Sequence, residues 1–156
     1  MRFVSILAVA CLALTGCSMF MRSIERPSAT VRDVSLSSAG FGGVSGQLQL
    51  DVTNPNSVGV PLSGIEWQLS IGSARAVAGS VELSQTIPAK GVAPVVTSLT
   101  INPRDAIAVA SALSSGARTY TLTAKLQFST AVGPLAIDIK HTGSLSSGAR
   151  NLPISF

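Results

Sequence analysis

The chain has 156 residues, only 12% of them charged, and a formal net charge of +4 at pH 7. The charged fraction is about half that of an average soluble protein, so serine, threonine, glycine and glutamine supply most of the polarity. The basic residues are spread singly from Arg22 to Arg150 with little aromatic interleaving, which argues against a nucleic-acid partner.

Residues 1–16 are predicted to be an export signal. Arg2 precedes an uncharged apolar run from Phe3 to Leu14. A run of about a dozen residues is shorter than the roughly 20 that a membrane-spanning helix needs. The run ends in Leu14-Thr15-Gly16-Cys17, which resembles the lipobox of bacterial lipoproteins. An ordinary signal peptide or an incidental apolar N-terminus remain the alternatives.

The lipobox resemblance implies cleavage between Gly16 and Cys17 and a fatty-acid anchor, such as palmitate, on Cys17. Ser18, rather than aspartate, follows the lipidated cysteine, and by the same resemblance this places the protein on the periplasmic face of the outer membrane. Cys11 leaves with the signal, so no thiol remains for a disulfide or a metal site. Residues 17–30 are predicted to be the lipidated cysteine and a tether, and residues 31–156 to be one domain.

From residue 31 onward apolar and polar residues tend to alternate, which is typical of strands with one buried face. A first strand is predicted at Val31–Leu36 and a glycine-rich loop at Ala39–Gly46. Further strands are predicted at Gln47–Val52, Ile65–Ile71, Arg75–Ala78, Ser80–Leu83, Val95–Ile101, Arg118–Phe128 and Leu135–Lys140. Pro88–Gly91 is predicted to be a turn, and a segment near Leu145 or at Leu152–Phe156 to add an edge strand.

One short helix is predicted over about residues 103–114. Asn102 is suited to the N-cap, Pro103 fits the first helical position, and Gly116 is a stop signal. The apolar face of this helix is predicted to consist of Ile107, Ala110 and Leu113.

About seven strands at this spacing, with one helix, predict an all-β fold. The economical architecture is an antiparallel β-sandwich of the immunoglobulin or fibronectin-III type. Apolar rows through Trp67 and Tyr120 are expected to supply its core.

Several stretches together resemble a known family. They are Leu50-Asp51-Val52-Thr53-Asn54-Pro55-Asn56, Pro61-Leu62, the row through Trp67, Pro88-Ala89-Lys90-Gly91, and His141-Thr142-Gly143. This pattern, from about Val31 to Leu145, is similar to the type 2 late embryogenesis abundant family, also called the water stress and hypersensitive response (WHy) domain. The resemblance implies a β-sandwich with a short helix, an association with desiccation or other stress, and no established catalytic site.

Two features allow a functional or a structural interpretation. Asn54-Pro55-Asn56 fits a ligand loop, but a strand-ending turn whose side-chain amides satisfy nearby backbone groups is favoured. Trp67, the only tryptophan, fits a sugar-stacking platform. Its place in an inward row of Ile and Leu favours a core role.

His141 and Asp138 are the candidates for a catalytic pair. A triad needs a nucleophile, a base and an orienting acid, and no sequence signature marks a nucleophile. Zinc needs three or four ligands, whereas the mature chain offers one imidazole and no thiol. The glycine-rich residues 39–43 lack the Gly-Lys-Ser/Thr of a phosphate loop. We therefore expect no enzyme activity, no cofactor and no metal, and a hydrolase is the least favoured reading.

The favoured function is that of a lipid-anchored, non-enzymatic envelope protein with a chaperone-like role in desiccation or osmotic stress. Its partners would be the membrane, through Cys17, and partly unfolded envelope proteins. The alternative is an adaptor that binds one dedicated envelope partner through an edge strand or loops.

Cys17→Ala should abolish fatty-acid labelling and leave unprocessed precursor, because the lipidated thiol is lost. Metabolic labelling with palmitate, followed by immunoprecipitation, measures this. Continued incorporation of label into the variant would contradict the anchor assignment.

Overall fold

The structure is a computed structural model that describes residues 24–40, 43–74, 76–145 and 154–155. The predicted signal, Cys17 and most of the predicted tether lie outside the described residues. In chain order the elements are β1 (Ser28–Gly40), β2 (Gly43–Thr53), β3 (Val60–Ile71), β4 (Val77–Ile87), β5 (Val92–Ile101), α2 (Pro103–Ser114), β6 (Thr119–Thr130), β7 (Gly133–Ser144) and β8 (Ile154–Ser155).

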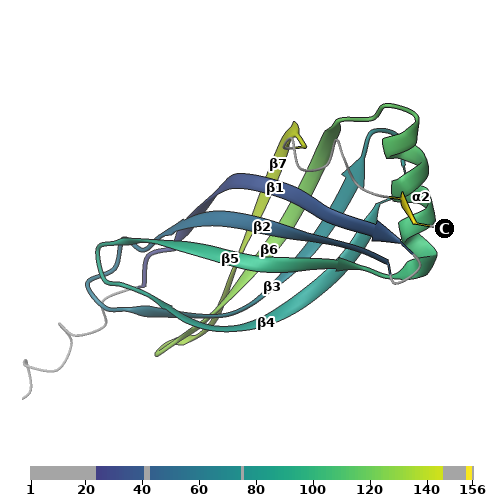
Figure 1. The fold of residues 1–156 in the computed structure, drawn as a ribbon. Coiled ribbons are helices and arrows are strands. Elements are labelled where there is room, and N and C mark those ends of the chain that lie inside the picture. The colour runs from purple at the N-terminus through teal and green to yellow at the C-terminus, as the bar shows by residue number, and fades with distance from the viewer. Residues whose placement is uncertain (1–23, 41–42, 75, 146–153, 156) are drawn as a thin grey trace, which may run out of the picture.

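The strands form two four-stranded sheets that pack face to face (Figure 1). One sheet has the order β5-β2-β1-β8 and the other has the order β4-β3-β6-β7. All neighbours are antiparallel except β1 and β8, which pair in parallel over two residues. Consecutive strands lie in different sheets at β2–β3, β4–β5, β5–β6 and β7–β8. The predicted all-β sandwich with one helix is confirmed.

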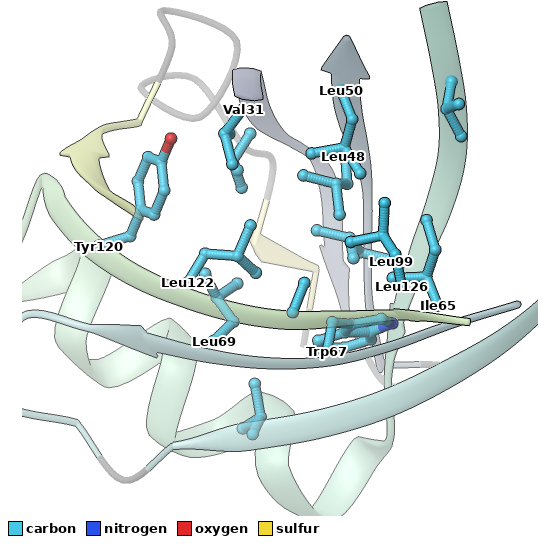
Figure 2. Packing of buried hydrophobic residues seen from close by; sticks show 14 of the residues in the cluster. Val31, Leu48, Leu50, Ile65, Trp67, Leu69, Leu99, Tyr120, Leu122 and Leu126 are labelled. Atoms are coloured by element: carbon cyan, nitrogen blue, oxygen red, sulfur yellow. The ribbon is translucent and has the colours of Figure 1, made fainter. Parts of the chain in front are cut away.

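The core lies between the two sheets, where each strand contributes alternate residues. Figure 2 shows side chains from both sheets meeting in this layer. The labelled core residues on β1, β2 and β5 are Val31, Leu48, Leu50 and Leu99, and those on β3 and β6 are Ile65, Trp67, Leu69, Tyr120, Leu122 and Leu126. The burial predicted for Trp67 and Tyr120 is confirmed, since they are 4% and 3% exposed.

The predicted loop at Ala39–Gly46 is wrong. Strand β1 continues to Gly40 and β2 begins at Gly43, and these two residues pair as the end of a hairpin. Gly46 lies inside β2, where an added Cβ would overlap the carbonyl oxygen of Ser35. This glycine is therefore suited to a close approach of two strands rather than to a loop.

The two short segments predicted on either side of Gly79 form the single strand β4. Gly79 pairs with Trp67 of β3, and an added Cβ at Gly79 would overlap the indole ring. The glycine looks like a break in the sequence pattern, but it leaves the space that the tryptophan ring occupies.

Strand β1 begins at Ser28, so the predicted boundary between tether and domain at residues 30 and 31 falls inside a strand. Ser28 pairs with Thr53 of β2, and Pro27 is already buried. The end of the predicted tether is therefore part of the sandwich.

Helix α2 has the predicted bounds, but its buried face shares only Leu113 with the predicted one. It ends in a Schellman motif, in which Gly116 at φ 92° allows Ala117 N–H to bond to the Ala112 carbonyl at 3.0 Å. Ile107 is 74% exposed, which contradicts the predicted apolar face. The buried residues are Ala106, Val109 and Leu113. Helix α2 packs against β1 and β2, and the position of these strands determines which residues of the helix are buried.

Trp67→Ala should lower the free energy of unfolding by about 3–5 kcal/mol, because a large buried ring is replaced by a cavity. Urea denaturation of the soluble domain measures this. Gln68→Ala, on the exposed face of the same strand, is the control and should cost no more than about 0.5 kcal/mol. Glu66 is a less clean control because it accepts a hydrogen bond from Gln127 Nε2 at 2.6 Å. Equal losses in the two variants would contradict the assignment of faces on β3.

Candidate functional site

Two turns and the N-terminal segment meet at the end of the sandwich opposite α2 (Figure 1). The first turn connects β2 to β3 and contains Asn54-Pro55-Asn56, and the second is Pro88–Gly91 between β4 and β5. We call Glu25, Asn54, Pro55, Asn56 and Lys90 the Asn-Pro-Asn cluster.

Asn54 is completely buried, and its side-chain amide joins the β2–β3 turn to the end of β4 and the start of the β4–β5 turn. Its Nδ2 group donates to the carbonyls of Val58 at 2.8 Å, Pro88 at 3.1 Å and Ile87 at 3.2 Å. Its Oδ1 accepts from Asn56 N–H and from Asn56 Nδ2, both at 2.9 Å. Three carbonyls surround one side of the amide and two donors the other, so an amide suits this position and a carboxylate does not.

Asn56, only 7% exposed, holds the segment that leads into β1. Its Oδ1 accepts from Glu25 N–H at 2.8 Å, and its Nδ2 donates to the Glu25 carbonyl at 2.9 Å. The side-chain amide thus bonds to both backbone groups of one residue, as a neighbouring strand would. This contact lies 31 residues apart in the sequence and closes the N-terminal end of the fold.

Lys90 completes the cluster from the second turn. It has a positive φ of 52°, the left-handed conformation that is uncommon outside glycine. Its N–H donates to the Asn56 carbonyl at 2.8 Å, and its Nζ donates to the Pro55 carbonyl. The next residue, Gly91, accepts from Asn54 N–H at 2.8 Å. The two turns are therefore bonded to each other through main chain and side chains.

The amides of Asn54 and Asn56 bond to other groups of the protein, as the turn interpretation expects. Across the described ranges, no buried side-chain nitrogen or oxygen lacks a hydrogen-bond partner. The cluster is thus a satisfied polar network, which fixes a conformation.

The candidate pair His141 and Asp138 is not brought together. Both lie on β7 three residues apart, and side chains at that spacing point to opposite faces of a strand. Asp138 is exposed on the outer face, whereas His141 is half-buried beside the ring of Tyr120, at 5.9 Å between ring centroids. Asp138 therefore cannot orient the imidazole as the acid of a triad does.

Tyr120 is the one described group with a clearly shifted pKa. Burial raises the pKa of its phenol, and the negative charge of Asp33 on β1 raises it further. The phenol therefore stays protonated at neutral pH and does not act as a base there.

The described residues contain neither a candidate metal site nor a candidate membrane-spanning helix. Among them, no three His, Cys, Asp or Glu side chains lie close enough together to hold a metal ion. No helix in the described ranges is long and apolar enough to cross a membrane.

The fold and the cluster define a β-sandwich domain whose turns are joined by buried asparagine amides. The family model described as late embryogenesis abundant protein (LEA_2) matches residues 49–143, which include the Asn-Pro-Asn turn and Trp67. The chain belongs to this late embryogenesis abundant family. No curated protein sequence gives a significant match.

Solved structures share the fold at low sequence identity. The solution structure of a protein assigned to the late embryogenesis abundant proteins has a TM-score of 0.61 and 21% identity, over 92% of this chain and 84% of that one. A solution structure from Arabidopsis thaliana has a TM-score of 0.66 and 20% identity, over 86% of each chain. A crystal structure of a protein from Archaeoglobus fulgidus has a TM-score of 0.53 and 12% identity, over 80% of this chain and 98% of that one.

Sequence reasoning missed Glu25 and Lys90 as members of the cluster. Glu25 takes part through its backbone N–H and carbonyl, and the type of its side chain does not predict such a contact. Lys90 stands before a glycine in a predicted turn, which is a signal for unusual backbone geometry but not for its contact with Asn56.

Asn54→Asp should lower the free energy of unfolding by about 3 kcal/mol or more, because it replaces a buried donor by a charged acceptor that faces three carbonyls. Chemical denaturation at neutral pH measures the loss. The defect should shrink as the pH is lowered, since a protonated carboxyl again donates a hydrogen bond.

Asn102→Asp is the matched control for this change. Asn102 is exposed before α2 and makes no side-chain capping bond, and a negative charge there is favoured by the helix dipole. We expect a change of no more than about 0.5 kcal/mol. A similar loss in both variants would contradict the role assigned to the Asn54 amide.

Proposed function

We propose that this protein is a lipid-anchored, non-enzymatic lipoprotein of the bacterial cell envelope with a WHy-type domain. Its role would be to protect partly unfolded envelope proteins during desiccation or osmotic stress. The observation that carries the proposal is membership in the late embryogenesis abundant family, joined to the lipobox-like residues Leu14–Cys17.

The Asn-Pro-Asn cluster supports a domain held close to its anchor. Asn56 binds the backbone of Glu25, so residues 18–24 separate Cys17 from the first residue that is bonded to the cluster. Seven residues span at most about 25 Å when fully extended. The end of the sandwich that carries the cluster would therefore stay near the membrane surface, and α2 would lie at the far end.

The outer faces of the sheets suit weak contacts with many proteins. On β4 the exposed outward side chains are Ala78, Ser80, Glu82, Ser84 and Thr86. On the edge strand β5, Val92 and Val96 are 58% and 56% exposed, with the exposed Pro94 between them. We propose that this short apolar row contacts exposed apolar segments of other proteins, while the mostly uncharged row on β4, with Glu82 as its one charged residue, keeps the contact transient.

The adaptor function remains the competing proposal. It differs in stoichiometry, since an adaptor binds one dedicated partner in a fixed ratio and protection needs no such partner. Crosslinking and pull-down of the lipidated protein from intact envelopes distinguishes the two.

The domain from Ser18 to Phe156 should reduce aggregation of an unrelated enzyme after drying or freeze–thaw. The effect should occur at near-equimolar ratio and exceed that of albumin at equal mass. Trp67→Ala, if it unfolds the domain, should lose the effect, and His141→Ala should keep it. Light scattering and recovered enzyme activity measure the protection.

The double variant Val92→Thr/Val96→Thr tests the contact surface at nearly constant side-chain shape, and we expect weaker protection from it. Val132→Thr makes the same chemical change at a residue that is 73% exposed in the β6–β7 turn, and it should protect like the original protein. No benefit over albumin, together with one stoichiometric envelope partner, would favour the adaptor instead.

A further inference from the structure

The edges of the two sheets differ in how they are protected. On the side where β4 and β5 lie, Gln85 Nε2 donates to the Pro94 carbonyl at 3.0 Å, and Pro94 has no N–H to offer. Strand β4 also carries a register shift opposite Leu62 and Gly64. Prolines and bulges of this kind block pairing with another strand.

Strand β1 is irregular along its length. Its register against β2 shifts between Val31 and Asp33 and again between Leu36 and Ser38, and its last two residues pair with β8. Strand β7 is different, because all twelve of its residues pair with β6 without a register shift. Among the described strands β6 is the one that pairs with β7, so the other side of β7 is a long regular edge.

The direction of the backbone groups on this edge follows from one hydrogen bond. Leu145 N–H, in continuation of β7, donates to the Arg118 carbonyl at 2.8 Å. Because backbone groups alternate in direction along a strand, the even-numbered residues of β7 point theirs away from β6. These residues are Ala136, Asp138, Lys140, Thr142 and Ser144, together with Pro134, which lacks an N–H. In an antiparallel pairing of two β7 strands centred on Ile139, Ser144 would face Pro134.

The charges on this edge are self-complementary. Asp138 and Lys140 are both exposed on the outer face, on either side of Ile139. If two β7 strands pair antiparallel with Ile139 opposite Ile139, each Asp138 lies opposite Lys140 of the other copy. A shift of two residues in either direction places Asp138 opposite Asp138 or Lys140 opposite Lys140, which is repulsive. A shift of one residue would place inner-face side chains of one copy on the outer face of the other.

The neighbouring strands extend the same alternation. Glu66 on β3 is in register with Lys125 on β6, and Lys125 is in register with Asp138. The three residues form a row of negative, positive and negative charge across the sheet. Lys140 of a second copy would add a positive charge next to Asp138. On the inner face Leu135 and Ile139 are half-buried, so pairing would also cover apolar surface at the open edge.

We propose that two copies of this chain associate through β7, antiparallel about a two-fold axis at Ile139, to form a continuous eight-stranded sheet. About eight backbone hydrogen bonds would join the copies, two for each of the four facing pairs of even-numbered residues. Charged residues on an edge usually prevent pairing. Here Asp138 and Lys140 attract each other in the proposed register and repel in the registers two residues to either side, which favours a second copy over arbitrary strands.

Disulfide trapping of the full-length chain in mild detergent tests the register. Cys11 and Cys17 are replaced by serine, so an introduced cysteine is the only thiol and neither export nor lipid is needed. Ile139→Cys should form a crosslinked dimer on mild oxidation, because facing residues of a non-hydrogen-bonded pair have Cα atoms about 4.5 Å apart, within disulfide range. Ala136→Cys is the control on the same strand, since the two copies of residue 136 would lie roughly 20 Å apart.

Charge reversal tests the specificity by sedimentation or native mass spectrometry. Asp138→Lys and Lys140→Asp should each weaken self-association roughly tenfold, because each makes two like-charged pairs. An equimolar mixture of the two variants should associate as well as the original chain, since every facing pair is again opposite in sign. Restoration in the mixture also shows that both variants are folded.

Equal crosslinking of Ile139→Cys and Ala136→Cys would overturn the proposed pairing. A mixture that associates no better than either variant alone would overturn it too, as would capture of a different protein at residue 139 in place of a second copy. None of these results bears on protection or lipidation, which the earlier experiments test separately.

Discussion

The rest of the structure depends on the buried amide of Asn54. A polar side chain with no exposed surface is tolerated only when its hydrogen bonds are satisfied. Asn54 meets this condition by bonding to the end of β4, the β4–β5 turn and the start of the chain toward β3. Since Asn54 directly follows β2, and β4 belongs to the other sheet, this one side chain helps to set the two sheets against each other at one end.

Asn56 links that end of the fold to the route by which the chain would reach a membrane. Through Glu25 it makes the last residues before β1 part of the domain. The proposed anchoring and the stability of the sandwich are thus connected through a few hydrogen bonds at one end.

The surfaces of the sandwich divide according to the same alternation that builds its core. Inward rows are apolar and close-packed, while outward rows carry few charges, among which Glu66, Lys125 and Asp138 are in register across β3, β6 and β7. Edges that could pair with any strand are interrupted by proline or register shifts, whereas β7 is regular and carries opposite charges two residues apart. The fold therefore separates outer faces that are poor in charge from a regular edge that carries opposite charges.

The sequence by itself determined the strands whose apolar residues alternate strictly, the bounds of α2, the position of the Asn-Pro-Asn turn and the family. These features depend on neighbours within a few residues, where side-chain alternation, Pro103 and Gly116 act directly. Only the tertiary structure decided which face of α2 is buried, why Gly46 and Gly79 lie inside strands, and what Asn54 and Asn56 bind. Each of those outcomes depends on a contact with a segment distant in the sequence: the sheet beside Ala106, the carbonyl of Ser35, the ring of Trp67 and the backbone of Glu25. A local pattern cannot specify such partners, because their positions are set only when the two sheets pack together.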